Sequence, residues 1–146
     1  MGYPVLAELV AVSWLRTFLT AGVATSLPAR DVSWEATVFV RVGSTGGAPH
    51  LYTGRQASVL GLDAFAFTEG SRQPPYGFAG TILGDVKARV DGQAVSGHVV
   101  TPAGYLDARL LGAAVNADPV RVPDEGGLAH YTMGLQLWWV PIAEEA

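Results

Sequence analysis

The chain contains no cysteine in its 146 residues, which excludes disulfide bonds, thiolate nucleophiles and cysteine-ligated zinc sites. Charged residues are also few, at 15% of the sequence against roughly 25% in an average soluble domain. Hydrophobic residues make up 49%, which is enough for one domain of this length to bury a core. With so few charges, part of the surface must be neutral or apolar. Such a surface is typical of a protein that binds partners.

Clusters of basic residues are missing as well. The cations are Lys87 and eight arginines spread singly along the chain, and the formal net charge is −4. A protein that grips nucleic acid needs a concentrated basic patch to displace counterions. We therefore expect no DNA binding through a basic face.

The sequence has no long apolar run. Residues 5–12 are apolar, but Glu8 interrupts them and no basic region precedes them, unlike in a signal peptide. The run is far shorter than the ~20 residues that span a bilayer. Gly2 does not begin a myristoylation signal, because Leu6 stands where Ser or Thr is required. We expect no membrane contact.

Motifs that carry catalysis are also missing. There is no Gly-x-Ser-x-Gly nucleophile elbow, and the glycine-rich segment 43–47 lacks the Gly-Lys-Ser/Thr of a phosphate-binding loop. We interpret that segment as a flexible loop. His50, His98 and His130 form no helical pair of metal ligands. Asp63 lies among apolar neighbours, and we interpret it as a strand-edge or buried hydrogen-bonding carboxylate rather than a catalytic base. We expect no catalytic residue, cofactor site or metal site.

Apolar spacing of three and four residues predicts two helices. The first covers residues 5–19 and ends near Thr20, with Gly22 as its stop. The second covers residues 78–91. Gly80 and Gly84 lie inside it, and each weakens a helix by about 1 kcal/mol relative to alanine.

Alternating apolar residues predict strands at 35–43, 55–67 and 128–140, with shorter extended pieces at 23–27 and 119–123. Residues 106–115 are interpreted as a further strand, because Gly104 precedes them and the last strand needs a partner, with a short helix as the alternative. The strand at 55–67 is apolar on both faces, which indicates a central strand covered on both sides. Trp138 and Trp139 are neighbours on one strand and must point to opposite faces. One enters the core, and the other lies either under a helix or at a subunit contact.

These elements follow the order helix–strand–strand–helix–strand–strand. Hairpin-length connections then predict a single α+β domain over residues 1–146, with an antiparallel or mixed sheet of about four to five strands and two flanking helices. Residues 93–105 fit the pattern least and are a possible loop insertion. Residues 141–146 form an acidic C-terminal tail.

Element order and local patterns together resemble the tail terminators of long-tailed bacteriophages, which cap the head-proximal end of the tail. The resemblance begins with the first helix, an extended segment ending at Pro28, and a strand that carries Arg41 into a glycine-containing segment. It continues through the long strand, a polar turn and a helix with small residues. It closes with residues 119–124, a glycine turn and a strand led by His130. Nearly the whole chain is covered, apart from residues 93–105.

The resemblance implies a hexameric ring that ends polymerisation of the tail tube and joins the tail to the head connector. Its partners would be further copies of itself, the tail-tube protein and the connector protein, with no cofactor. The protein would assemble in the host cytoplasm and remain in the virion. DNA would pass through the lumen without specific binding, and the net negative charge predicts a lumen lined by carboxylates. We expect subunit or tube contacts at Arg41, Arg55, His130, Gln136 and Trp138.

Two alternatives remain open at this point. The chain fits another head–tail connector, completion or tail-tube protein, which would share ring assembly and differ in what it stacks on. It also fits a small α+β ligand-binding domain or enzyme with a pocket between helices and sheet. A deep pocket that joins Asp63 to a histidine would favour the second alternative, and a flat apolar side surface would favour the ring.

Overall fold

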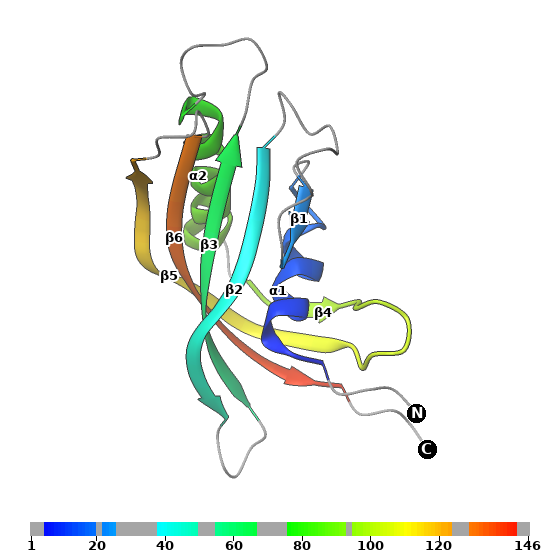
Figure 1. The fold of residues 1–146 in the computed structure, drawn as a ribbon. Coiled ribbons are helices and arrows are strands. Elements are labelled where there is room, and N and C mark those ends of the chain that lie inside the picture. The colour runs from blue at the N-terminus through cyan, green and yellow to red at the C-terminus, as the bar shows by residue number, and fades with distance from the viewer. Residues whose placement is uncertain are drawn as a thin grey trace.

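The computed structural model describes residues 5–19, 22–25, 38–49, 55–66, 76–92, 95–123 and 129–142. Within them the chain forms two helices and six strands (Figure 1). In chain order they are α1 (Ala7–Leu15), β1 (Gly22–Ala24), β2 (Val38–Pro49), β3 (Gln56–Ala66), α2 (Tyr76–Gly92), β4 (Gly97–Val99), β5 (Ala108–Val122) and β6 (Ala129–Pro141). The strands make one curled sheet with the order β1-β2-β3-β6-β5-β4. β1 runs parallel to β2 and every other pair is antiparallel, so the sheet is mixed.

The predicted fold class is wrong. Strand residues predominate over helix, and the order is α-β-β-β-α-β-β-β instead of helix–strand–strand–helix–strand–strand with four to five strands. The prediction missed β4 as a strand, because it lies within residues 93–105, and treated β1 only as an extended piece. Each of these strands has three residues, too few to show an alternation in the sequence. Pairing with a longer neighbour holds them in place.

β2 continues through the segment that we predicted to be a flexible loop. Its ladder with β3 extends as far as the pair Pro49 and Gln56, with a shift of register between Ser44 and Gly46. Gly47 has a φ of 108°, and a side chain there would collide with the backbone of Ala57. Glycine is therefore required at this position by the backbone of a bulged strand, and it does not indicate a mobile loop.

β5 joins two pieces that the sequence pattern had separated, residues 106–115 and 119–123. Its register against β6 shifts between Leu110 and Gly112 and at two later points, up to Val120. Each such irregularity adds a residue to one strand and interrupts the alternation of buried and exposed positions. The interruptions made one strand of 15 residues resemble two.

Both helices pack on the same face of the sheet, which we call the inner face. Buried residues of the two helices share one core with inner-face strand residues such as Leu60, Leu62 and Leu135. α1 is shorter than predicted. After Leu15 the chain turns, and the Arg16 guanidinium donates two hydrogen bonds to the Val23 carbonyl, at 3.0 and 2.7 Å, which tie the turn to β1.

The opposite surface of the sheet is the outer face. On β3 it carries Val59, Gly61, Asp63 and Phe65, which alternate with the buried inner residues. Among the described residues, neither helix lies on this face. The described helices therefore cover only the inner face of the central strand, and on its outer face Phe65 is nevertheless buried, so the prediction of cover on both sides stays a prediction.

Candidate functional site on the outer face of the sheet

All five residues predicted for subunit or tube contacts belong to the outer face. His130, Gln136 and Trp138 alternate along β6 with the inner residues Met133, Leu135, Leu137 and Trp139. Arg41 stands between buried Val40 and Val42 on β2, and Arg55 directly precedes β3. The structure sorts these five residues into two groups with Gln136 between them.

The first group, the Asp63 cluster, consists of Arg41, Asp63, Phe65 and His130. Arg41 Nη2 donates to Asp63 Oδ2 at 3.3 Å, and His130 Nε2 lies 2.8 Å from Asp63 Oδ1. The His130 ring stacks on Phe65 with ring centroids 4.3 Å apart, and the Arg41 guanidinium lies 5.2 Å from the centre of the Phe65 ring. Three neighbouring strands, β2, β3 and β6, therefore hold one polar network around a phenyl ring.

The network lies close to the surface. The exposed fractions of the side chains are 41% for Arg41, 23% for Asp63 and 17% for His130. Both oxygens of Asp63 have partners, in agreement with the interpretation of Asp63 as a hydrogen-bonding carboxylate. Its position is central in β3, though, and not at an edge of the sheet. Sequence reasoning named Arg41 and His130 but did not connect them through Asp63.

The second group, the Trp138 pocket, is a shallow hollow of about 360 Å³ lined by Arg55, Leu111, Gly112 and Trp138. Leu111 is 41% exposed and Trp138 is 36% exposed, both high values for large apolar side chains. Leu111 occupies the shift of register between Leu110 and Gly112, and bulges of this kind re-aim a side chain. Sequence reasoning missed Leu111 because a bulge has no signature in the alternation.

The structure separates the roles of the two neighbouring tryptophans. Trp139 is 3% exposed, and its Nε1 donates to the Ser58 hydroxyl at 3.1 Å. Trp138 points to the outer face, where no described helix covers it. The sequence left two possibilities for the tryptophan outside the core, a position under a helix or a subunit contact. Since neither described helix covers Trp138, the first possibility is excluded for these helices.

Gln136 lies between the Asp63 cluster and the Trp138 pocket, opposite Val59 of β3 and Ala114 of β5. Beside it a row of glycines crosses three strands, with Gly43 paired to Gly61 and Gly61 paired to Gly134. A side chain at Gly134 would collide with the Asn116 carboxamide. The space that these glycines leave on the outer face is partly filled by neighbouring side chains, Asn116 at Gly134 and Thr45 at Gly61.

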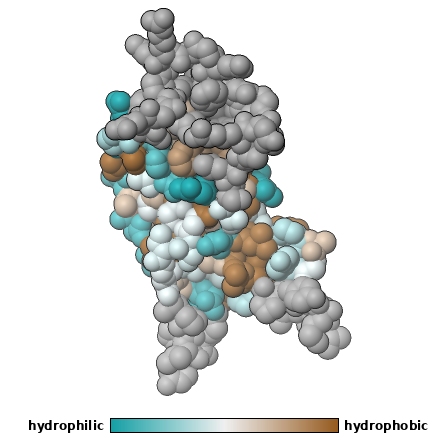
Figure 2. All heavy atoms as spheres, viewed as in Figure 1, coloured by the Kyte–Doolittle hydropathy of each residue, from teal (hydrophilic) through white to brown (hydrophobic). Residues whose placement is uncertain are grey.

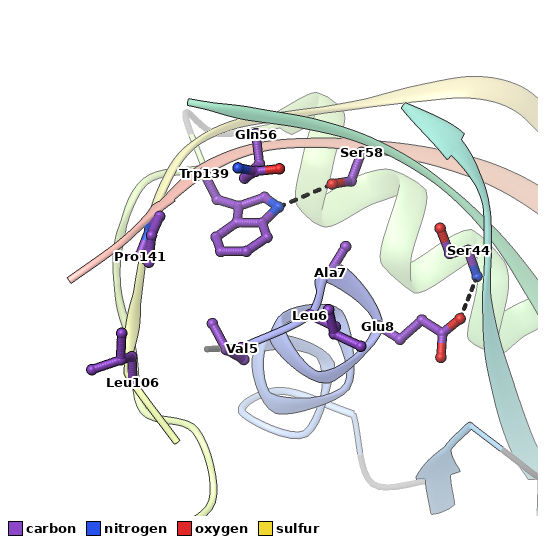
Figure 3. A pocket seen from close by; sticks show the side chains of 10 residues that line it. All are labelled: Val5, Leu6, Ala7, Glu8, Ser44, Gln56, Ser58, Leu106, Trp139 and Pro141. Atoms are coloured by element: carbon purple, nitrogen blue, oxygen red, sulfur yellow. Dashed lines mark hydrogen bonds between the residues drawn. The ribbon is translucent and has the colours of Figure 1, made fainter. Parts of the chain in front are cut away.

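A larger pocket of about 490 Å³ lies on the inner face, between the start of α1 and the sheet (Figure 3). Its walls come from α1 and the segment before it, β2, β3, Leu106 and the end of β6. Two of its polar groups already have partners. The Glu8 carboxylate accepts from the Ser44 N–H at 3.0 Å, and the Ser58 hydroxyl accepts from Trp139 (Figure 3).

Apolar surface also gathers beside this pocket. In Figure 2 the strongest hydrophobic colour on the described surface lies over the N-terminal part of α1, whereas the strands in view are mostly pale or hydrophilic. Leu6, at the rim of the pocket, is 74% exposed. The described residues therefore expose large apolar side chains near α1 and in the Trp138 pocket, and also at Val100 and Tyr105 between β4 and β5 and at Val120 on β5.

A second pair of histidine and aspartate fixes the connection between β4 and β5. Asp107 Oδ1 accepts from the Thr101 N–H at 3.0 Å, and Asp107 Oδ2 lies 2.7 Å from His98 Nε2. The Thr101 hydrogen bond and then the His98 ring hold the pKa of the Asp107 carboxyl below its ordinary value of 3.8. His50 lies outside the described residues. Among those described, no three histidine or acidic side chains converge as metal ligands would.

No protein-family model and no curated protein matches this chain. Neither α1 nor α2, the helices of the described part of the chain, is long and apolar enough to cross a membrane.

Proposed function

We propose that this chain is a structural subunit that assembles with copies of itself into a ring, and that the ring is a phage tail terminator. It would cap the tail tube, end the polymerisation of the tube and join the tail to the head connector. The observation that carries the proposal is the Trp138 pocket. Two large apolar side chains, Leu111 and Trp138, stand exposed beside Arg55 on a sheet face that no described helix covers.

A ring needs two different surfaces on every subunit, each complementary to the other. The helix layer on one side of the sheet and the outer face, on which no described helix lies, supply two such surfaces. Tryptophan and arginine are also the residues that most often dominate the energy of protein contacts. The outer face therefore supports a role in contacts between proteins.

The outer face does not suit the lumen. It carries Arg41, Arg55 and Arg109, whereas our proposal predicts a lumen lined by carboxylates so that DNA passes without being held. Arg109 belongs to this face because it lies between buried Ala108 and Leu110. We therefore assign the outer face to contacts with other subunits or with the tube.

The edges of the sheet favour a terminator over a tube subunit. β4 covers β5 only at Ala108–Leu110, and in the described residues the rest of β5 contains two further shifts of register and Pro119. The uncovered part of β2 contains a shift of register and Pro49. Bulges and prolines at an edge oppose the addition of further strands. Such edges fit a protein that adds once and then stops.

The alternative of an enzyme or ligand-binding domain receives support from the contact between Asp63 and His130. However, these two residues lie on the outer face, and the pocket of about 490 Å³ lies on the inner face, lined by neither of them. This alternative would be favoured by a pocket that joins Asp63 to a histidine. Neither the Trp138 pocket nor the inner pocket does so. A connector or completion protein would use the same outer surface for its contacts. An experiment must therefore distinguish a connector protein from a terminator.

Electron microscopy of the full chain mixed with tail tubes, assembled from the tube protein of the same genome, tests the proposal. We expect one ring at one end of each tube and no growth beyond it. Continuous tubes built from this chain would identify a tube protein instead. Rings that bind the connector but not the tube would identify a connector, and absence of binding to either would contradict a role at the head–tail junction.

A further inference from the structure

The Trp138 pocket is bordered by positive charge. Arg55 lines the pocket, and Arg109 lies on β5, two positions before the pocket residue Leu111. Arg109 is exposed and, among the described residues, has no ion pair. An apolar centre with arginines at its border fits a partner surface that carries a carboxylate beside small side chains.

The exposed side of α2 offers such a surface. Asp85 is exposed there and, within the described part of the chain, no cation pairs with it. The two cations of α2 are already engaged. Lys87 Nζ bonds to Asp118 at 2.8 Å, and the Arg89 guanidinium lies 5.4 Å from the centre of the Phe18 ring. The exposed neighbours Thr81, Gly84 and Ala88 are small, so a partner can approach the helix closely.

α2 packs on the inner face, whereas the Trp138 pocket opens on the outer face. The two surfaces therefore point to opposite sides of the subunit and cannot meet within one copy. We infer that α2 of one copy docks on the Trp138 pocket of the next, with Asp85 facing Arg109 across the contact. This inference rests on the proposed ring, because repetition of such a heterologous contact either closes a ring or forms a filament.

Because the chain has no cysteine, disulfide trapping can test the contact without background. The double variant Arg109→Cys with Asp85→Cys is oxidised both free at high concentration and on tail tubes. Both positions are exposed, so the substitutions leave the fold intact. We expect a ladder of cross-linked species that extends beyond the dimer, because every subunit gives one cysteine to each neighbour.

The matched controls are the two single variants and the pair Arg109→Cys with Leu6→Cys, which places the second cysteine at another exposed site. None of them should form a ladder. A dimer from Arg109→Cys alone would show that outer faces meet each other, and a dimer from Asp85→Cys alone would show that helices meet each other. Either result overturns the inference, and so does a ladder from the Leu6 control.

The remaining outcomes separate this contact from the proposed function. Rings on tubes without a ladder would leave the function standing and overturn the contact. A ladder without tube binding would leave the contact standing and contradict the function. Neither rings nor a ladder would contradict both.

A charge exchange provides an independent check against simple misfolding. Arg109→Asp and Asp85→Arg should each weaken association by about tenfold, because like charges then face each other across the contact. The double variant should recover most of the lost association, measured as occupied tube ends or by sedimentation. Two single losses without recovery in the double variant would overturn the pairing of these residues.

Discussion

Trp138 and Trp139 are consecutive residues of β6 in opposite surroundings. Trp139 lies in the core and satisfies its indole N–H with Ser58, whereas Trp138 lies exposed beside Leu111 and Arg55. A buried indole stabilises the monomer through the area that it removes from water. Trp138 is 36% exposed, so its indole gains further burial only when a partner covers it.

Alanine at these two positions should therefore have different effects. Trp139→Ala should lower the free energy of unfolding by about 3 to 5 kcal/mol because it opens a cavity in the core. Trp138→Ala should lower it by less, about 1 to 3 kcal/mol, because Trp138 is 36% exposed and only part of its side chain is buried, but it should abolish ring assembly. Urea denaturation measures the first effect and electron microscopy with tubes the second. Equal destabilisation by the two variants would show that Trp138 is also a core residue.

Asp107 predicts a dependence of stability on pH. Because its pKa is lowered in the folded chain, its contribution is fully present above the ordinary aspartate pKa of 3.8 and disappears as the pH falls through the lower folded value. Asp107→Asn should therefore destabilise the chain at neutral pH and much less in acid. Urea denaturation of both proteins across this range measures the difference. A difference that stays constant into acid would contradict the prediction.

At this scale the sequence supported some predictions and not others. Alternation alone placed His130, Gln136 and Trp138 on one face of their strand, because side chains of a strand alternate by geometry. The contact of Arg41 and His130 with Asp63 depends on the register of three strands, and His130 is 67 residues from Asp63 in the sequence. No local pattern encodes such a pairing.

At the scale of elements, α2 shows how two glycines in one helix differ. A methyl group at Gly84 would meet no atom within 4 Å, whereas at Gly80 it would lie 3.2 Å from Cζ of Tyr131. Gly80 therefore allows α2 to approach β6, and Gly84 has no such constraint in the monomer.

Gly84→Ala should accordingly raise the free energy of unfolding by about 1 kcal/mol, since alanine favours the helix over the unfolded chain. Gly80→Ala should give no such gain, because the crowding against Tyr131 offsets it. Thermal and urea denaturation of the two variants provide the comparison. Equal stabilisation by both would show that the approach of α2 to Tyr131 is not tight.

Among the elements, length and regularity decided what could be predicted. The long strands β3 and β6 and the helix α2 lie close to their predicted ranges, because their apolar residues recur regularly, whereas α1 ends four residues earlier than its predicted range of 5–19. The three-residue strand β4, the bulged strand β5 and the strand portion at 43–47 were misjudged. Their conformation is set by pairing with neighbours and by glycine at a bulge, neither of which has a periodic signal.

For the whole molecule, the decisive feature is that both described helices share one face of the sheet. The sequence predicted two helices and several strands but gave no information on which side each helix packs. An apolar outer position such as Val59 therefore suggested a covered face. The outer face, on which no described helix lies and on which our functional proposal depends, emerged only from the arrangement in space.

The order of strands also has a consequence for synthesis on the ribosome. β3 lies next to β6 at the centre of the sheet, although more than sixty residues separate them. Until β6 has left the ribosome, the half of the sheet with β1 to β3 and the half with β4 and β5 have no strand to join them. The edge of β3 that pairs with β6 therefore has no partner strand for about half of the translation of the chain. This interval is when the protein is most exposed to aggregation and most dependent on chaperones.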